Sequence, residues 1–138
     1  MKLALVSSAV EVTDNRLITT ADKIAEICYQ NRIELVSGGC IGVIELSIRK
    51  LAQLGGVSTV FSPDVDEDSH SIRHDNLPLG IASHYFHTKG FTQRSLNMIN
   101  YVDGLIVVGG RMGTLSEVSI ALEEGKRVGV ITNTGGIA

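Results

Sequence analysis

Short runs of β-branched and apolar residues alternate along this chain with longer stretches that have helical spacing. The runs predict strands over residues 2–6, 33–36, 57–61, 81–86, 104–108 and 128–132. The longer stretches predict helices over residues 17–30, 41–54, 91–102 and 114–124. Short apolar strands that are separated by helices are typical of a mainly parallel sheet covered on both faces. We therefore expect an α/β fold, a single doubly wound domain over residues 1–138, with ligands bound beyond the carboxyl ends of the strands.

The composition argues against several classes of function. The longest apolar runs are far shorter than the roughly 20 residues of a membrane span. The net charge is -3, and the lysines and arginines are scattered, so no basic stripe is available for duplex nucleic acid. Aromatic residues make up only 4% of the chain, which leaves few platforms for stacked bases. We expect a soluble protein that binds neither a membrane nor a long nucleic acid.

The cysteines and the two ends of the chain suggest its setting. Cys28 and Cys40 lie in unlike contexts without C-x-x-C spacing, and no signal-peptide pattern precedes them. We expect reduced thiols and a cytoplasmic protein. At the other end the chain stops at NTGGIA, where a turn and a further helix are expected. This predicts either a truncated C-terminus or a short last element.

The sequence SGGCIGV, residues 37–43, joins a predicted strand to a predicted helix, and we call it the first glycine loop. Glycines let the backbone approach a ligand closely, and the N–H groups at a helix start favour an anion. We expect Gly38, Gly39 and Gly42 to contribute to a nucleotide site. The alternative is a tight turn that holds no ligand. It is not a Walker loop, because no G-K-[ST] follows.

The sequence GGRMGT, residues 109–114, repeats this arrangement after the strand predicted at 104–108, and we call it the second glycine loop. Carboxyl ends of parallel strands meet at one edge of a sheet, so the two loops together predict one nucleotide pocket. In such a pocket, one loop would hold a phosphate and the other would line the sugar. The residues of this loop that we expect at the ligand are Gly109, Gly110, Arg111, Gly113 and Thr114.

Thr114 and Glu117 also match a capping box, T-x-x-E, in which the threonine caps a helix and the glutamate reaches back to the cap. On spacing alone the cap is the favoured interpretation, although a carboxylate held by a helix start can also act on a ligand. Arg94 lies on a predicted helix whose apolar positions, Phe91 among them, are expected to pack inward. By itself this arginine is most simply a solvated side chain. Asp103, before Gly104, is most simply a turn residue.

The histidines fall in pairs, but the pattern does not predict a metal site. His70 and His74 lie in an acidic segment, residues 64–78, that has no periodic pattern and is long enough to form a lid or flap. His84 and His87 would point to opposite faces of the strand predicted at 81–86. Cys40 is expected to be a small buried residue and not a nucleophile.

Together, SGGCIGV and QRSLNMINYVDGLIVVGGRMGTLSEV resemble the LOG family of Rossmann-like phosphoribohydrolases, which are often mislabelled as lysine decarboxylases. That family has G-G-G-x-x-G-[LV] after its second strand, then R-K, an aspartate, an apolar strand and P-G-G-x-G-T-x-x-E. Arg94, Asp103 and Glu117 stand at the matching positions, and the likeness covers most of the chain from Leu3 onward. The departures are Val108 for proline, Ser95 for lysine, Cys40 for the third glycine, and VSS without its preceding glycine.

The resemblance implies a Rossmann-like fold and hydrolysis of the N-glycosidic bond of a nucleoside 5′-monophosphate to free base and ribose 5-phosphate, not lysine decarboxylation. Glu117 would orient the ribose or the attacking water and stabilise the oxocarbenium-like sugar, and Arg94 would hold the phosphate or help the base to leave. Ser7 and Ser8 would line the nucleotide, with no metal or organic cofactor.

The resemblance also implies a homodimer with the arginine-bearing helix near its interface. The departures are like those of the uncharacterised LOG-like branch, for which the fold and the pocket transfer better than the reaction. The alternative is therefore a non-catalytic sensor of a nucleotide-derived ligand. A DNA-processing role is disfavoured by the acidic balance and the scarcity of aromatic residues.

Overall fold

The computed structural model describes residues 1–73, 77–78 and 80–138, which form a parallel sheet with helices on both faces. The strands are β1 (Lys2–Ser7), β2 (Glu34–Ser37), β3 (Ser58–Ser62), β4 (His84–His87), β5 (Gly104–Val108) and β6 (Arg127–Ile131). The helices are α1 (Asn15–Gln30), α2 (Val43–Leu54), α3 (Glu67–Ile72), α4 (Phe91–Tyr101) and α5 (Met112–Glu123).

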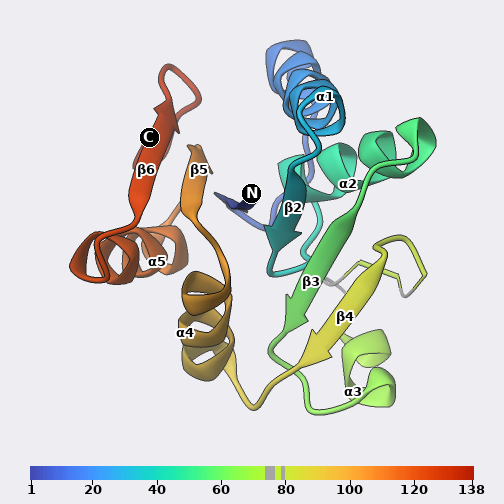
Figure 1. The fold of residues 1–138 in the computed structure, drawn as a ribbon, viewed down its shortest axis with the longest axis vertical. Helices are drawn as coiled ribbons and strands as arrows, with labels where there is room; N and C mark the ends of the chain where they lie inside the picture. The colour runs from blue at the N-terminus through green and yellow to red at the C-terminus, as the bar shows by residue number, and fades with distance from the viewer. Residues whose placement is uncertain (74–76, 79) are drawn as a thin grey trace.

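The order of the strands confirms the doubly wound α/β prediction. The described residues form a six-stranded sheet in the order β4-β3-β2-β1-β5-β6, and every neighbouring pair is parallel. Figure 1 shows β4 and β6 at the two edges of the arrangement. The chain moves outward from β1 to β4 and then returns to pair β5 with the other side of β1. The topological switch point therefore lies between β1 and β5, and folds of this kind bind ligands outside the carboxyl ends of the strands at this point.

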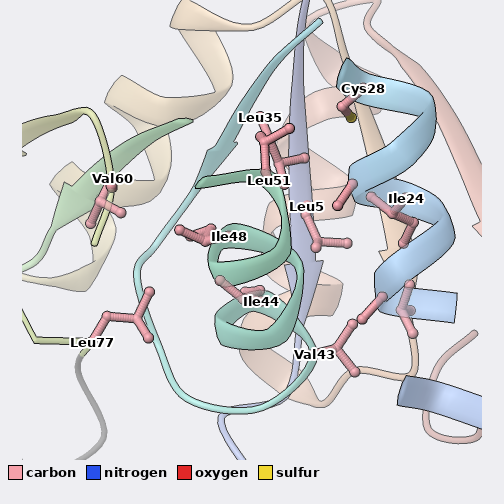
Figure 2. Close-up of a cluster of buried hydrophobic side chains, with 14 residues drawn as sticks. Leu5, Ile24, Cys28, Leu35, Val43, Ile44, Ile48, Leu51, Val60 and Leu77 are labelled. Carbon is pink, nitrogen blue, oxygen red and sulfur yellow. The ribbon is translucent and has the colours of Figure 1, made fainter. Parts of the chain in front are cut away.

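The two faces of the sheet carry separate apolar clusters. Leu5, Leu35 and Val60 pack with α1 and α2, whose side chains close over them in Figure 2. The adjacent strand residues point to the opposite face, as the two-residue period of a strand requires. On that face, Val6 and Val36 belong to a second cluster with residues of α4 and α5. The sheet is thus covered on both sides, and the ends of β1 and β5 lie between the two layers of helices.

Local signals explain where the helices begin and end. The Asp14 carboxylate accepts from the Arg16 N–H at 2.8 Å, so α1 begins two residues before the predicted position. Gly55 ends α2 in the left-handed conformation at φ 87°, which only glycine adopts readily. The predicted strand over 81–86 begins later, at His84, because the N–H groups of Ile81 and Ala82 donate to the Tyr85 hydroxyl.

The acidic segment over 64–78 is not wholly irregular, since α3 forms inside it. Asp66 caps this helix by accepting from the Ser69 N–H at 2.8 Å. His70 is fully buried, and its ring nitrogens lie 2.8 Å from Ser62 Oγ and 2.7 Å from the Leu77 carbonyl oxygen. The segment therefore contains a helix that the sequence did not predict, because its buried residue is the polar His70 and not part of an apolar pattern. His74 lies outside the described residues, so its pairing with His70 has no structural account.

Three further sequence predictions concern the histidines of β4, Asp103 and the absence of a membrane span. His84 and His87 both lie in β4, three positions apart, and so on opposite faces as expected. The Asp103 carboxylate accepts from the Lys2 N–H at 2.8 Å and fixes the start of β1, at the amino end of the sheet. None of the helices in the described residues has the length and hydropathy of a membrane span.

Candidate active site at the ends of β1 and β5

A cleft of about 280 Å³ opens at the carboxyl end of β1, at the switch point of the sheet. It is bounded by the segment after β1, the first glycine loop, α4 and the start of α5. Eight of the residues predicted from sequence line it: Ser7, Ser8, Gly38, Arg94, Arg111, Gly113, Thr114 and Glu117. In the described part of the chain, its lining leaves out Gly39, Gly42, Gly109 and Gly110. The last two line a neighbouring cavity that shares Ser7, Ser8 and Arg111 with the cleft.

Arg94 lines this cleft with a side chain that is only 14% exposed, whereas Arg111, the other arginine in the lining, is exposed. Arg94 Nη2 lies 3.5 Å from Glu117 Oε1, and its Nη1 donates to the Gly38 carbonyl oxygen over 3.4 Å. Its Nε is buried and has no hydrogen-bond partner among the described residues. The prediction of a solvated arginine was therefore wrong, because the first turn of α4 lies beside the first glycine loop and turns this side chain inward.

Glu117 faces Arg94 from α5, with its side chain 9% exposed. The Ser95 hydroxyl donates to its Oε1 over 3.3 Å. Burial raises the pKa of the Glu117 carboxyl above its ordinary value, and Arg94 and Ser95 oppose this shift only in part. The arrangement is a buried carboxyl group with a raised pKa beside a buried cation, which is a combination common at functional sites.

The capping-box interpretation of Thr114 and Glu117 was wrong. Helix α5 begins at Met112 with Arg111 as its N-cap, and no side chain of the described residues caps it. Gly109 and Gly110 adopt φ values of 61° and 102°, which turn the chain so sharply that the helix starts before Thr114. The carboxylate of Glu117 is thereby placed one turn into the helix and faces α4.

The backbone of the first glycine loop is bonded to, or packed against, other groups of the protein. The Gly39 carbonyl oxygen accepts from the Leu77 N–H at 2.8 Å, and its N–H donates to Ser37 Oγ at 3.2 Å. Gly42, at φ 102°, caps α2 so close to the segment after β1 that an added Cβ would lie 2.4 Å from the Val10 carbonyl oxygen. Cys40 packs against the core on the α1 and α2 face but is only half-buried, so the prediction of a buried residue is confirmed in part.

The second glycine loop is tied down at its start and open at its end. The Gly109 N–H donates to Thr134 Oγ1 at 2.9 Å, and the Gly110 carbonyl oxygen accepts from the Ile137 N–H at 3.1 Å. By contrast, an added Cβ at Gly113 would meet no heavy atom of the described residues within 4 Å. Arg111 is exposed beside it. The part of this loop available to a ligand is therefore the first turn of α5.

Two further residues of the site have roles that the sequence did not predict. Phe91 lines the cleft and is 53% exposed, with the Arg94 guanidinium 5.4 Å from its ring centre, so the expectation that it packs inward was wrong. Phe91 is the first residue of α4, and Gly90 before it is the N-cap of this helix. Ser95 was marked only as a departure from the LOG pattern, and its bond to Glu117 depends on the packing of α4 against α5, which no local pattern reports.

Comparison with known sequences identifies relatives over nearly the whole chain. A model of the SLOG cluster4 family matches residues 3–137. An uncharacterised protein from Archaeoglobus fulgidus is 33% identical over 115 residues, which are 83% of this chain and 70% of that protein.

Several solved structures share the fold. TM1055 matches with a TM-score of 0.81 and 23% identity, over 98% of this chain and 76% of that one. The molybdenum cofactor binding protein from Rippkaea orientalis matches with a TM-score of 0.72 and 21% identity, over 94% and 73%. DNA processing protein A from Helicobacter pylori, described with a single-stranded DNA binding mode, matches at 0.68 and 16%, over 99% and 68%. At these identities the likeness establishes the fold alone.

Proposed function

The chain belongs to the SLOG cluster4 family, and we propose that its cleft binds a nucleotide-derived anion through Arg94. The observation that carries this proposal is the state of the guanidinium group. It is nearly buried, its two polar contacts are long at 3.4 and 3.5 Å, and its Nε has no partner among the described residues. A buried cation with so few good acceptors is costly, and the oxygens of a phosphate would supply them.

The start of α5 supports the position of the phosphate in this proposal. The first turn of a helix presents N–H groups without intrahelical partners, and these favour an anion. Here Gly113 leaves room for a close approach, and Arg111 stands at the N-cap. We assign the phosphate to the space between this turn and Arg94, with Thr114, Ser7 and Ser8 donating from the walls. Gly109 and Gly110 would act by shaping the turn, and Gly39 and Gly42 by shaping the loop opposite.

The reaction we propose is hydrolysis of the N-glycosidic bond of a nucleoside 5′-monophosphate. The oxygen of a water molecule bonds to C1′ of the ribose, and the C1′–N bond breaks with its electron pair leaving on the base. Glu117 takes the proton that the water loses and passes it to the departing base. As a carboxylate it also stabilises the positive charge that develops on the sugar. A raised pKa suits a group that must both accept and return a proton.

The alternative is a sensor that binds the same ligand without cleaving it, and one experiment separates the two. Purified protein is incubated with the monophosphates of adenosine, guanosine, cytidine and uridine, the products are separated by chromatography, and thermal stability is measured alongside. A free base from the wild type but not from Glu117→Gln supports the enzyme. Thermal stabilisation without a free base supports the sensor. If neither occurs with any of the four nucleotides, the proposal fails.

We also propose that the chain forms a homodimer through α4 and α5. These helices expose four apolar side chains: Leu96 on α4, and Met112, Leu115 and Leu122 on α5. Exposed apolar residues that gather on adjacent helices are typical of an interface. Sedimentation of the wild type and of Leu115→Glu tests this, since a dimer that dissociates in the variant is expected. A wild type that sediments as a monomer at all concentrations would refute it.

A further inference from the structure

We propose that Gly38 is a positioning residue, whose missing side chain makes the space in which the Arg94 guanidinium sits against Glu117. The sequence predicted Gly38 as part of a nucleotide site. In the structure, the place beside it is filled by the protein's own cation. The effect of Gly38 on ligand binding rests on the function proposed above, but the seating of Arg94 can be tested without any ligand.

The steric observation is specific to one side chain. An added Cβ at Gly38 would lie 2.1 Å from Arg94 Nη1 and 2.9 Å from Arg94 Cζ, and the third nearest heavy atom is again in Arg94. Real Cβ atoms essentially never approach a neighbour so closely, so one of the two groups would have to move. The carbonyl oxygen of Gly38 also accepts from Nη1 over 3.4 Å, so the residue both admits the guanidinium and binds it.

The backbone gives no other reason for glycine at this position. The φ angle of Gly38 lies outside the positive range that disfavours other residues, whereas Gly39 and Gly42 have φ values of 69° and 102°. Those two glycines are required by the turn itself. An alanine at position 38 would be compatible with the backbone, and the contact with Arg94 is what it would disturb.

When the two groups compete, the arginine side chain is the one expected to move. The loop is held on both sides of Gly38, because Ser37 pairs with Val60 in the sheet and Gly39 accepts from the Leu77 N–H. Arg94, in contrast, is a long flexible side chain whose tip makes only long polar contacts. Gly38→Ala is therefore expected to fold normally and to displace the guanidinium from Glu117.

The first test measures the titration of the Glu117 carboxyl by carbon NMR without ligand. The charge of Arg94 lowers the pKa of this group against the effect of burial, so we expect a higher pKa when that charge is removed or displaced. We expect Gly38→Ala and Arg94→Ala to raise it, and the double variant to match Arg94→Ala alone. The control is Gly129→Ala in β6, where an added Cβ would approach only the Leu105 carbonyl oxygen, at 3.8 Å. A Gly38→Ala titration that matches the wild type would overturn the proposal.

The second test is a double-mutant cycle with adenosine 5′-monophosphate as the probe. Gly38→Ala is expected to weaken binding at least about tenfold, or about 1.4 kcal/mol, and to weaken it no further when Arg94 is already alanine. Equal losses in both backgrounds would mean that Gly38 contacts the ligand directly, and would overturn the positioning role. If the wild type does not bind the probe, the proposed function fails there, and the titration still decides the role of Gly38.

Discussion

The two glycine loops are similar in sequence, but in the structure one is bonded to protein groups and the other leaves a helix start open. Both follow a strand, both begin a helix, and both lie at the same edge of the sheet. The first loop is closed by protein groups, since Gly38 accepts from Arg94 and Gly39 accepts from Leu77. The second loop ends in an uncapped helix turn beside Gly113, where an added Cβ would meet open space.

The difference shows that a glycine at a strand-to-helix junction can serve a side chain as readily as a ligand. Two observations separate these cases: the φ angle of the glycine, and the atoms that a Cβ would meet. Gly38 has no positive φ, and the atoms nearest to an added Cβ at this position belong to Arg94. Gly110 has both a positive φ and a crowded neighbour, Thr114. Of the glycines in the two loops, only Gly113 is unconstrained on both counts, and it lines the cleft.

The largest effect on stability is expected at Gly110, which holds the sharp turn of the second glycine loop. At φ 102°, an alanine is strained, and its Cβ would lie 2.7 Å from Thr114 Cγ2. We expect Gly110→Ala to lower the free energy of unfolding by about 1–3 kcal/mol. Urea denaturation measures this loss, with Gly129→Ala as the control. A loss below about 0.5 kcal/mol would show that the turn is less constrained than the structure indicates.

The next effect is on pH dependence, at Glu117, where α5 packs against α4. The pKa of Glu117 is raised in the folded protein, so this group stabilises the fold fully below its unfolded value and loses that contribution as the pH rises through the folded pKa. Relative to Glu117→Gln, the wild type should therefore lose stability as the pH rises above about 4.5. Denaturation of both proteins across this range tests the sign. A difference that stays constant with pH would contradict the raised pKa.

Gly113→Ala should separate stability from binding in the second loop. Alanine is the better helix former, and its Cβ would meet no heavy atom of the described residues, so the variant should gain up to about 0.5 kcal/mol. The same Cβ would narrow the approach to the first turn of α5, so binding of adenosine 5′-monophosphate should weaken. Denaturation and calorimetry on one preparation compare the two quantities. Unchanged affinity would remove Gly113 from the phosphate site.

The smallest effect is expected for Thr114→Val, which removes the hydroxyl and keeps the branched shape. A capping threonine would lose about 1 kcal/mol on this change. Because Thr114 lies inside α5 and the N-cap is Arg111, we expect a loss below about 0.5 kcal/mol. Thermal denaturation distinguishes these values. A full loss would restore the capping-box interpretation.

The sequence predicted the elements that depend on local patterns. The apolar period located the strands and most helices, and parallel strands then required that the two loops meet at one edge. Glu117 and Arg94 were selected as a pair only through a family spacing, since the contact between α4 and α5 has no local signal. Helix α3 was missed because its buried residue is His70, which satisfies its ring nitrogens with Ser62 and Leu77 in place of apolar contacts.

The position of the Arg94 guanidinium beside Gly38 could not be predicted for a related reason. Gly38 and Arg94 are 56 residues apart, and no local pattern in either segment indicates that the two are in contact. The capping box failed because the position of a helix start depends on the φ angles of the glycines before it, which the letters T-x-x-E do not specify. What the sequence does contain is a glycine and an arginine whose roles become clear once the fold brings them together.

A calorimetric titration with adenosine 5′-monophosphate and the three other nucleoside monophosphates tests whether the cleft binds a nucleotide through Arg94. We predict saturable binding of at least one of them to the wild type, loss of that binding in Arg94→Ala, and retention in Arg49→Ala, which removes an arginine paired with Glu45 on α2 outside the cleft. Equal binding by the wild type and Arg94→Ala, or no binding of any of the four nucleotides to the wild type, would contradict this prediction.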